Sequence, residues 1–404
     1  MSLTAAQTQN EASTAEAKLR ILFVSRYLWG YDGITIHLKR LAKELQRRGH
    51  EVALASGTDE ARRQKYDDLR WFDEHMTHYF VPFPERLSWR AIGQCTHALR
   101  ALHRVIRTFE PSVIHSHSLS LIPYFSLLRG LHDPPLVSTC HIEFDQARPD
   151  IRMASLASRL YPSLLSDHII AKSLTLANAF SEQLHFPSDK ITQIYYGIDD
   201  NHFRPPTVSE RRLARESFGL KAHDHVVCLV GRLDPVKGHR ILFDAVHALK
   251  KAGLRVKAIC AGTGEKFEGE IKALSGKLQL DDQNIFPGHA DARQVYWASD
   301  IKVLPSYREG NPIVISEAML CGLPAIRTPT SGAQDQTIEA ETGYIVPFDA
   351  PDQLAERMRY LFDHPEKRAE MGRAAQTYAK QHFTLEATVD QTERLYRRMI
   401  LSTQ

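Results

Sequence analysis

The chain alternates short apolar runs with longer amphipathic stretches, and it does so in two series. At the start of the first series, residues 19–25 and 51–56 predict strands, and residues 33–48 between them have helical spacing. Strands that alternate with helices in this way favour a parallel sheet with helices on both faces. The sequence therefore predicts an α/β fold.

The two series predict two Rossmann-like domains, because 404 residues are enough for two domains of ordinary size. Pro205 and Pro206 interrupt the periodicity and indicate a linker at residues 201–208. The further expected strands are 113–115, 136–141, 168–171, 191–195, 225–230, 255–261, 284–286, 301–304 and 325–327. The expected divisions are a flexible tail at 1–17, an N-terminal domain at 18–200, a C-terminal domain at 201–384 and a C-terminal helix at 385–404 packing toward the N-terminal domain.

Composition excludes several classes of protein. The formal charge of +3 does not indicate nucleic-acid binding, and the five scattered cysteines suggest neither a disulfide framework nor a thiolate zinc site. No apolar run approaches the roughly 20 residues that span a bilayer, and the first 17 residues lack the pattern of a secretion signal. We expect a cytoplasmic protein.

A segment with two glutamates, Glu309 and Glu317, follows the expected strand at 301–304. Gly310 and Pro312 lie between them, and proline in the first helical turn is preorganised for helix entry. The free amide groups of such a turn suit an anion or a hydroxyl group. The two carboxylates can contact different parts of one ligand there. Exposed carboxylates at a helix start are the alternative, because acidic residues are common at that position.

A second turn, from Gly231 to Gly238, follows the expected strand at 225–230 and contains Arg232 and Lys237. A guanidinium and an ammonium group in one cleft suit a diphosphate, since negative charge grows on a leaving phosphate. A solvated basic loop is the alternative. The chain has no Asp-x-Asp triplet of the kind that metal-dependent nucleotide-sugar enzymes use, so we expect no metal site.

Weaker signals lie in the first series. Gly33 stands in the first strand-to-helix turn, where a glycine allows backbone amides to approach a phosphate. His115, His117 and His141 lie at the ends of expected strands, where parallel sheets present residues to a ligand. His141 is the preferred site residue of the three. A structural role and a ligand contact remain open for His115 and His117, and a metal site would need a third ligand.

The spacing of Glu309 and Glu317 resembles the E-x7-E signature of the retaining glycosyltransferase family 4, and the turn from Gly231 resembles the family motif G-R-L-x-x-x-K-G. Gly33 resembles the family's glycine-rich loop, although this chain has Asp32-Gly33 where the family often has two glycines. The resemblance runs from about residue 19 to the C-terminal helix. It implies the GT-B fold, in which two Rossmann-like domains face each other across a cleft and the last helix crosses back to the N-terminal domain.

The resemblance also implies a reaction: transfer of a sugar from a nucleotide diphosphate sugar to a hydroxyl acceptor, with retention, by same-face substitution. A UDP-sugar is favoured as donor and co-substrate, and neither a metal nor another cofactor is implied. Glu309 would contact sugar hydroxyls and Glu317 the ribose, while His141 would contact the sugar. The implied catalytic residues are Glu309, His141, Arg232 and Lys237. The implied donor-binding residues are Gly33, Gly231, Arg232, Lys237, Gly262, Gly264, Phe286, His289, Gly310, Asn311, Pro312, Ile313 and Glu317.

Other functions stay open, namely a related epimerase or phosphorylase and a non-catalytic scaffold that binds a sugar nucleotide. The acceptor, a glycan or a lipid-linked molecule by family likeness, is expected near residues 27–32, 59–85 and 142–149, where the pattern is least regular. Residues 88–109 interleave apolar residues with arginines, so a helix there could lie on anionic lipid. An ordinary helix packed on the sheet is the alternative.

Overall fold

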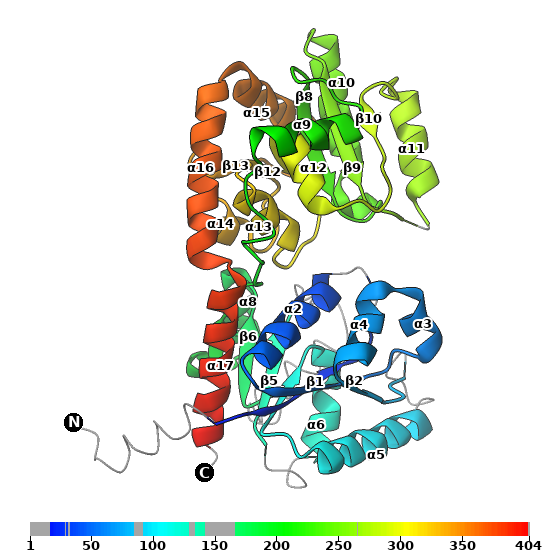
Figure 1. Ribbon diagram of the computed structural model, residues 1–404, viewed down its shortest axis with the longest axis vertical. Helices are drawn as coiled ribbons and strands as arrows, with labels where there is room; N and C mark the ends of the chain where they lie inside the picture. The colour runs from blue at the N-terminus through cyan, green and yellow to red at the C-terminus, as the bar shows by residue number, and fades with distance from the viewer. Residues whose placement is uncertain are drawn as a thin grey trace, which may run out of the picture. The chain divides into compact units, whose positions relative to one another are not determined.

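We describe the protein from a computed structural model, which covers residues 17–28, 30, 33–84, 92–128, 134–141, 166–264 and 266–402 (Figure 1). The chain divides into two compact units. The first is Met1–Gly197 together with Leu385–Gln404, and the second is Ile198–Thr384. The expected linker at residues 201–208 thus belongs to the second unit, whose first helix begins at Val208.

The first unit is built on a seven-stranded sheet in the order β3-β2-β1-β4-β5-β6-β7. Every neighbouring pair is parallel. Parallel strands need crossover connections, which place helices over both faces and favour apolar strands. The strands are β1 (Arg20–Ser25), β2 (Glu51–Ser56), β3 (Thr77–Phe80), β4 (Val113–Ser116), β5 (Leu136–Cys140), β6 (His168–Ala171) and β7 (Ile191–Gln193).

Successive side chains of these strands enter separate cores on the two faces of the sheet. Ile21 and Phe23 of β1 join a core with α2 and α4, whereas Leu22 and Val24 join one with α5 and α6 (Figure 1). This alternation follows from the two-residue period of a strand. The helices are α2 (Gly33–Arg47), α3 (Glu60–Lys65), α4 (Asp67–His75), α5 (Ile92–Phe109), α6 (Ile122–Leu128), α8 (Leu174–Asn178) and α17 (Leu385–Leu401), with short helical turns at Leu119–Leu121, Ala179–Gln183 and Ser188–Lys190.

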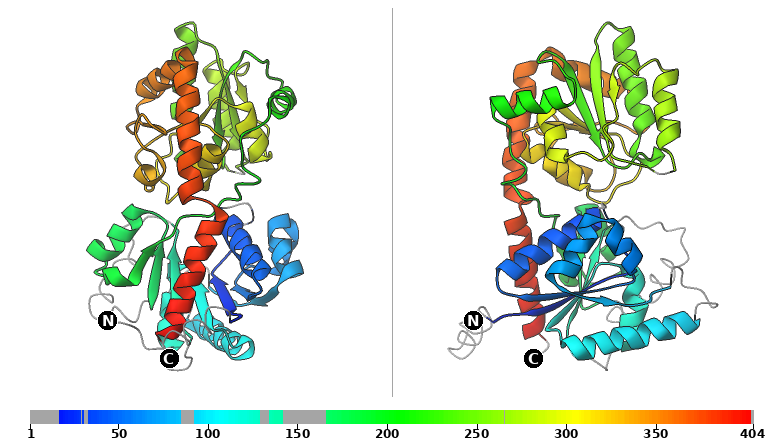
Figure 2. Two further views of the ribbon diagram at one scale, coloured as in Figure 1. Left: turned by 60° about the vertical axis from the view of Figure 1, so that its left-hand side comes forward. Right: turned by 45° about the vertical axis from the view of Figure 1, so that its right-hand side comes forward.

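Helix α17 packs in the first unit, although it is the last helix of the chain (Figure 2). Val389, Leu395 and Tyr396 are buried in the core that contains β1 and α2. The Tyr396 hydroxyl forms a hydrogen bond with His115 Nδ1 of β4. A C-terminal helix that completes the N-terminal core was expected from the resemblance.

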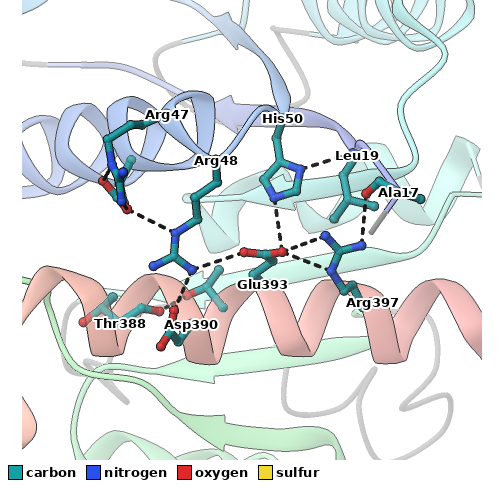
Figure 3. A network of polar contacts seen from close by, with 11 residues as sticks. Ala17, Leu19, Arg47, Arg48, His50, Thr388, Asp390, Glu393 and Arg397 are labelled. Atoms are coloured by element: carbon teal, nitrogen blue, oxygen red, sulfur yellow. Dashed lines mark hydrogen bonds and ion pairs between the residues drawn. The ribbon is translucent and has the colours of Figure 1, made fainter. Parts of the chain in front are cut away.

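Charged groups hold the same helix against the segment that follows α2 (Figure 3). The Glu393 carboxylate accepts hydrogen bonds from Arg397 at 2.7 Å and from Arg48 at 3.2 Å. His50 Nδ1 accepts the Leu19 amide, so its proton is on Nε2, which lies 3.3 Å from Glu393. Burial raises the pKa of Glu393, but the guanidinium groups of Arg397 and Arg48 outweigh burial and hold the pKa below its ordinary value.

The second unit holds a six-stranded parallel sheet in the order β10-β9-β8-β11-β12-β13. Both units therefore have the Rossmann-like architecture that the sequence predicts. The strands are β8 (His225–Val230), β9 (Val256–Ala261), β10 (Asn284–Ile285), β11 (Ile301–Leu304), β12 (Ala325–Arg327) and β13 (Gly343–Ile345). The helices are α9 (Val208–Ser217), α10 (His239–Lys251), α11 (Glu268–Lys277), α12 (Ala292–Ala298), α13 (Ile313–Leu320), α14 (Ala333–Gln336), α15 (Pro351–Asp363) and α16 (Pro365–His382), with a 3-10 helix at Pro235–Lys237.

Residues 59–85 are more regular than their sequence suggested, since they contain α3, α4 and β3. Asp59 caps α3 by accepting the Arg62 amide at 2.8 Å. Two of these elements lack a strong apolar pattern, because α3 buries no side chain and β3 is a half-exposed edge strand. The expectation of an irregular segment here was wrong. The expected loop at residues 142–149 lies outside the described residues.

Helix α5 uses its apolar side within the first unit. Leu102 and Phe109 are buried in the core under the sheet, while Arg104 and Arg107 are exposed. This arrangement matches the alternative of an ordinary packed helix. Residues 88–91 of the expected helix lie outside the described residues. Within the described ranges, no helix combines the length and apolar character needed to cross a membrane.

Candidate functional site

Both glutamates of the predicted donor site lie beyond the carboxyl end of β11. Glu309 precedes α13, and Glu317 is the only charged residue of that almost wholly buried helix. Glu317 is 5% exposed and accepts a hydrogen bond from the Tyr296 hydroxyl at 3.2 Å. The side chain of Glu309 is 10% exposed. These are not the exposed helix-start carboxylates of the alternative interpretation.

Lys237 and Glu309 join the two strongest sequence motifs in one ion pair. Lys237 Nζ lies 2.8 Å from Glu309 Oε1, and both side chains are mostly buried. The close contact between the two turns depends on Gly238. This residue has φ 74°, and a Cβ there would lie 2.0 Å from the Pro305 carbonyl oxygen. A pair shielded from water in this way is screened less by salt than a surface pair.

Arg232 does not join this ion pair. Its side chain is 70% exposed, and NH1 lies 3.6 Å from Asp234 Oδ2. Asp234 instead fixes the turn by accepting the Val236 amide at 2.9 Å. The guanidinium of Arg232 is therefore exposed in this structure, and its contact with a diphosphate stays a prediction.

Three turns at the carboxyl ends of β8, β9 and β10 form one continuous layer. The Gly231 amide donates to the Ala261 carbonyl at 2.9 Å, and the Gly262 amide donates to the Gly288 carbonyl at 2.8 Å. A Cβ at Gly262 would lie 2.0 Å from the Gly231 carbonyl oxygen, so the turns touch through backbone. Ligands of open α/β sheets bind at this end of the strands.

Phe286, Gly264 and His289 are among the predicted donor-binding residues. Phe286 packs edge-on against Phe243, with ring centroids 6.1 Å apart, and contributes to the core of the second unit. The predicted donor-binding Gly264 donates its amide to Glu268 Oε2 at 3.2 Å. These contacts give Phe286 and Gly264 structural partners, and the donor-binding roles of Phe286, His289 and Gly264 stay predictions.

Two buried residues near the predicted donor-binding turn were not identified from the sequence. Gln336 Nε2 donates to Asn311 Oδ1 at 2.9 Å and to the Pro312 carbonyl at 3.1 Å. Arg327, which is fully buried, donates to Gln336 Oε1 at 2.6 Å. Burial lowers the pKa of Arg327 to about 10. A charged residue at the end of a short apolar strand was the signal that could have indicated Arg327.

In the first unit, the histidines predicted at the strand ends gather with His37 from α2. The rings of His117 and His141 stack with centroids 5.5 Å apart, and His37 lies 6.0 Å from His141. Burial lowers the pKa of His37, His115, His117 and His141 well below its usual range, and the Lys172 ammonium lowers it further. All four imidazoles are therefore neutral at neutral pH.

His141 already has protein partners for both ring nitrogens. Nδ1 lies 2.6 Å from the Tyr196 hydroxyl, and Nε2 lies 3.3 Å from His117 Nδ1. A sugar hydroxyl would have to replace one of these partners or meet the backbone of His141. Direct contact between His141 and the donor stays a prediction.

The other two histidines of the predicted strand ends differ from each other. Both nitrogens of His115 are bonded, Nδ1 to the Tyr396 hydroxyl and Nε2 to Thr139 Oγ1 at 2.6 Å, which matches a structural role. His117 Nε2 is buried and has no hydrogen-bond partner among the described residues. Gly33 begins α2 and is exposed, while its neighbours 31 and 32 lie outside the described residues.

The buried histidines predict that the first unit loses stability in acid. An imidazole whose pKa is lowered by folding takes up its proton only on unfolding, once the pH falls below the unfolded value of about 6.5. Stability that is present above this pH is lost as the pH falls, by about 1.4 kcal/mol per histidine and pH unit. We expect the guanidinium chloride concentration at the midpoint of unfolding to decrease as the pH is lowered from about 7.5 to 5.5. Amide exchange in β4 reports on the first unit in this experiment.

The variant His37→Phe tests how much one of these histidines contributes to the loss of stability in acid. Both ring nitrogens of His37 are buried without a partner among the described residues, so phenylalanine removes no hydrogen bond. The variant should equal the wild type near pH 7.5 and lose about 1 kcal/mol less stability between about pH 6.5 and 5.5. Equal losses in the two proteins would show that His37 titrates normally.

No group of three or more histidine, cysteine, aspartate or glutamate side chains suited to a metal ion occurs in the described part of the chain. Metal independence therefore rests on the sequence motifs and stays a prediction.

Models of known protein families match both halves of the chain. Residues 31–202 match the family model described as Glycosyltransferase Family 4, and residues 210–378 match the model described as Glycosyl transferases group 1. Together the two matched segments take in both Rossmann-like units.

Curated relatives carry the name D-inositol 3-phosphate glycosyltransferase. The protein from Segniliparus rotundus is 28% identical over 296 residues, which are 69% of this chain and 64% of that protein. The protein from Corynebacterium aurimucosum is 25% identical over 382 residues, which are 90% of each chain.

Solved structures show the same fold. A glycosyltransferase from Rickettsia africae has a TM-score of 0.82 at 18% identity, covering 95% of this chain and 99% of that one. Anabaena Alr3699/HepE in complex with UDP has a TM-score of 0.80 at 23% identity, covering 96% and 100%. At these identities the likeness concerns the fold, which is GT-B.

Proposed function

This chain belongs to glycosyltransferase family 4, and from that premise we propose that it moves a sugar from a nucleoside diphosphate sugar to an acceptor hydroxyl with retention of anomeric configuration. The observation that carries the proposal is the ion pair of Lys237 with Glu309, at 2.8 Å. It places a cation suited to phosphate beside a carboxylate suited to sugar hydroxyls, at the ligand-binding end of the second sheet.

In the proposed reaction, Glu309 accepts hydrogen bonds from hydroxyls of the donor sugar and Glu317 holds the ribose. The bond between the anomeric carbon and the phosphate oxygen breaks, and the departing phosphate keeps the electron pair. Lys237 and Arg232 balance the charge that develops on the diphosphate. The acceptor oxygen attacks from the same face, and its proton passes to the departing phosphate. The protein contributes positioning and electrostatic stabilisation.

The proposed donor is a UDP-sugar, because HepE, which shares this fold, was crystallised with UDP and with UDP-glucose. The acceptor is proposed to be a glycan, a lipid-linked molecule or another hydroxyl compound. D-inositol 3-phosphate, which appears in the names of the curated relatives, is the first acceptor to try. We further propose a cytoplasmic location, with the arginines of α5 as the place for any contact with anionic lipid.

Calorimetry with UDP, GDP, ADP and CMP, with and without EDTA, tests the donor site first. We expect one diphosphate to bind and EDTA to leave its affinity unchanged. Turnover assays with the matching sugar nucleotide should then release nucleotide only when an acceptor such as D-inositol 3-phosphate is added.

Other outcomes favour the alternatives. Conversion of the sugar nucleotide to an isomer without acceptor would favour an epimerase. Tight binding without turnover over a broad acceptor panel would favour a non-catalytic scaffold. Loss of binding on adding EDTA would contradict metal independence.

A further inference from the structure

Lys302 lies within β11 and is fully buried, with 0% of its surface exposed. Its Nζ has no hydrogen-bond partner among the described residues. The residues paired with it on the adjacent strands are Cys228 and Ala325, neither of which bears a charge at neutral pH. A buried ammonium group without a hydrogen-bond partner is among the most costly groups to place in a protein interior. No family motif found in the sequence includes Lys302, so its presence calls for another explanation.

The side chain of Lys302 points to the face of the sheet that is covered by α12. Its strand neighbours Ile301 and Val303 enter the opposite core, with α10 and α15. Lys302 Nζ lies 6.0 Å from the ring centroid of Tyr296 on α12. The Tyr296 hydroxyl in turn donates to Glu317 on α13. Tyr296 therefore lies between Lys302 and the carboxylate that we assign to the ribose.

The charge of Lys302 is coupled to the donor site. Burial lowers its pKa to about 8, whereas the carboxylates of Glu317 and Glu309 favour the charged form and Lys237 opposes it. The lysine is therefore mostly protonated at neutral pH. Water screens a buried charge poorly, so it acts over a longer distance than a surface charge does.

We propose that Lys302 is an electrostatic positioning residue, whose buried charge attracts the diphosphate of the donor from beneath the site. The inference rests on the proposed function, since it needs an anionic donor at the ends of β8, β9 and β11. Binding of that anion would compensate a charge that the protein alone leaves without a hydrogen-bond partner.

Lys302→Met tests the proposal, because methionine fills similar space without the charge. We expect the Kd for the preferred nucleoside diphosphate to rise about tenfold, as for one charge acting over roughly 10 Å at an effective dielectric constant of about 20. The Kd for the corresponding nucleoside, which lacks the phosphates, should stay unchanged. The Tm should stay equal or rise, since removal of a poorly paired buried charge is often stabilising.

The matched control is Lys257→Met, which removes a lysine from β9 near the start of the strand. Its diphosphate affinity should equal that of the wild type. The proposal is overturned if Lys302→Met weakens the binding of nucleoside and diphosphate equally, or if it lowers the Tm. Either result would assign Lys302 a packing role.

A pH series adds a second readout. Wild-type affinity for the diphosphate should fall between about pH 7.5 and 9 as Lys302 loses its proton, while that of Lys302→Met should not fall in parallel. The charged and titratable groups around Lys302 are Cys228, Cys260, His239, Tyr296, Lys237, Glu309 and Glu317. The pKa of each thiol and of the Tyr296 phenol is raised by burial, and that of His239 is lowered to about 4, so these four titrate outside the window.

The outcomes separate this inference from its premise. A wild-type protein that binds none of the diphosphates overturns the proposed donor site and this inference with it. A wild-type protein that binds one of them, with Lys302→Met binding equally well and with the same pH profile, overturns this inference alone.

Discussion

Glu309→Gln should lower kcat/KM for sugar transfer by about a thousandfold or more while the protein stays folded. Glutamine keeps the shape of the side chain but removes the charge that pairs with Lys237 at 2.8 Å. In the role proposed for Glu309, the lost carboxylate can no longer accept strong hydrogen bonds from the donor sugar as positive charge grows on that sugar in the transition state. Steady-state kinetics with the donor found by calorimetry, together with the Tm of both proteins, measures the effect.

The experiment must distinguish a loss of catalysis from a loss of stability caused by an unpaired buried charge. Glu309→Gln leaves Lys237 without its partner, and that alone can destabilise the turn. The double variant Glu309→Gln with Lys237→Met removes both charges, so its Tm should recover while its activity stays lost. Glu341→Gln, at an exposed glutamate of the same unit, is the matched control and should retain full activity. Near-normal turnover of Glu309→Gln would contradict the assigned site.

The sequence predicted the framework of both sheets well where strands are buried on both faces. β2, β6, β8, β11 and β12 begin and end where they were expected, because such strands are short apolar runs bounded by turns. β3 and β13 were missed for the opposite reason. Both are short edge strands, so neighbouring strands hold them in place more than their own composition does.

The candidate site was predictable to the extent that its residues belong to continuous motifs. Glu309, Glu317 and Lys237 stand at fixed spacings within strand-to-helix turns, and the structure places Glu309 and Lys237 in contact. Arg327 and Lys302 could not be identified in this way. Each is a single charged residue in a strand, and only packing of helices from elsewhere in the chain makes it a buried cation.

Local sequence gave no sign of the partners of His141 either. Tyr196 and His117 come from segments far away along the chain, and their hydrogen bonds depend on the order of strands in the sheet. A strand-end histidine can be identified from its position, but whether its ring nitrogens are free for a ligand depends on the packed structure.

Tyr396→Ala should lower the free energy of unfolding of the first unit by about 3 to 5 kcal/mol, the usual cost of removing a large buried aromatic ring. Tyr396 is fully buried in the core that α17 shares with β1 and α2. The substitution opens a cavity there and also leaves His115 Nδ1 without its hydroxyl partner. Tyr396→Phe keeps the ring and loses only the hydrogen bond, so we expect a cost of about 1 kcal/mol.

Comparison of these two variants tests whether packing or polar contacts hold α17 in place. Chemical denaturation and amide exchange in β1 and β4 report on the first unit, and Tyr360→Ala, at a partly exposed tyrosine of the second unit, is the control. A larger loss for alanine than for phenylalanine assigns the attachment to the buried ring. Equal losses would show that the hydrogen bond to His115, which both variants lack, accounts for the whole contribution of Tyr396. The difference in unfolding free energy between the two variants gives the contribution of the ring, because both variants lack the hydroxyl and they differ only in the ring.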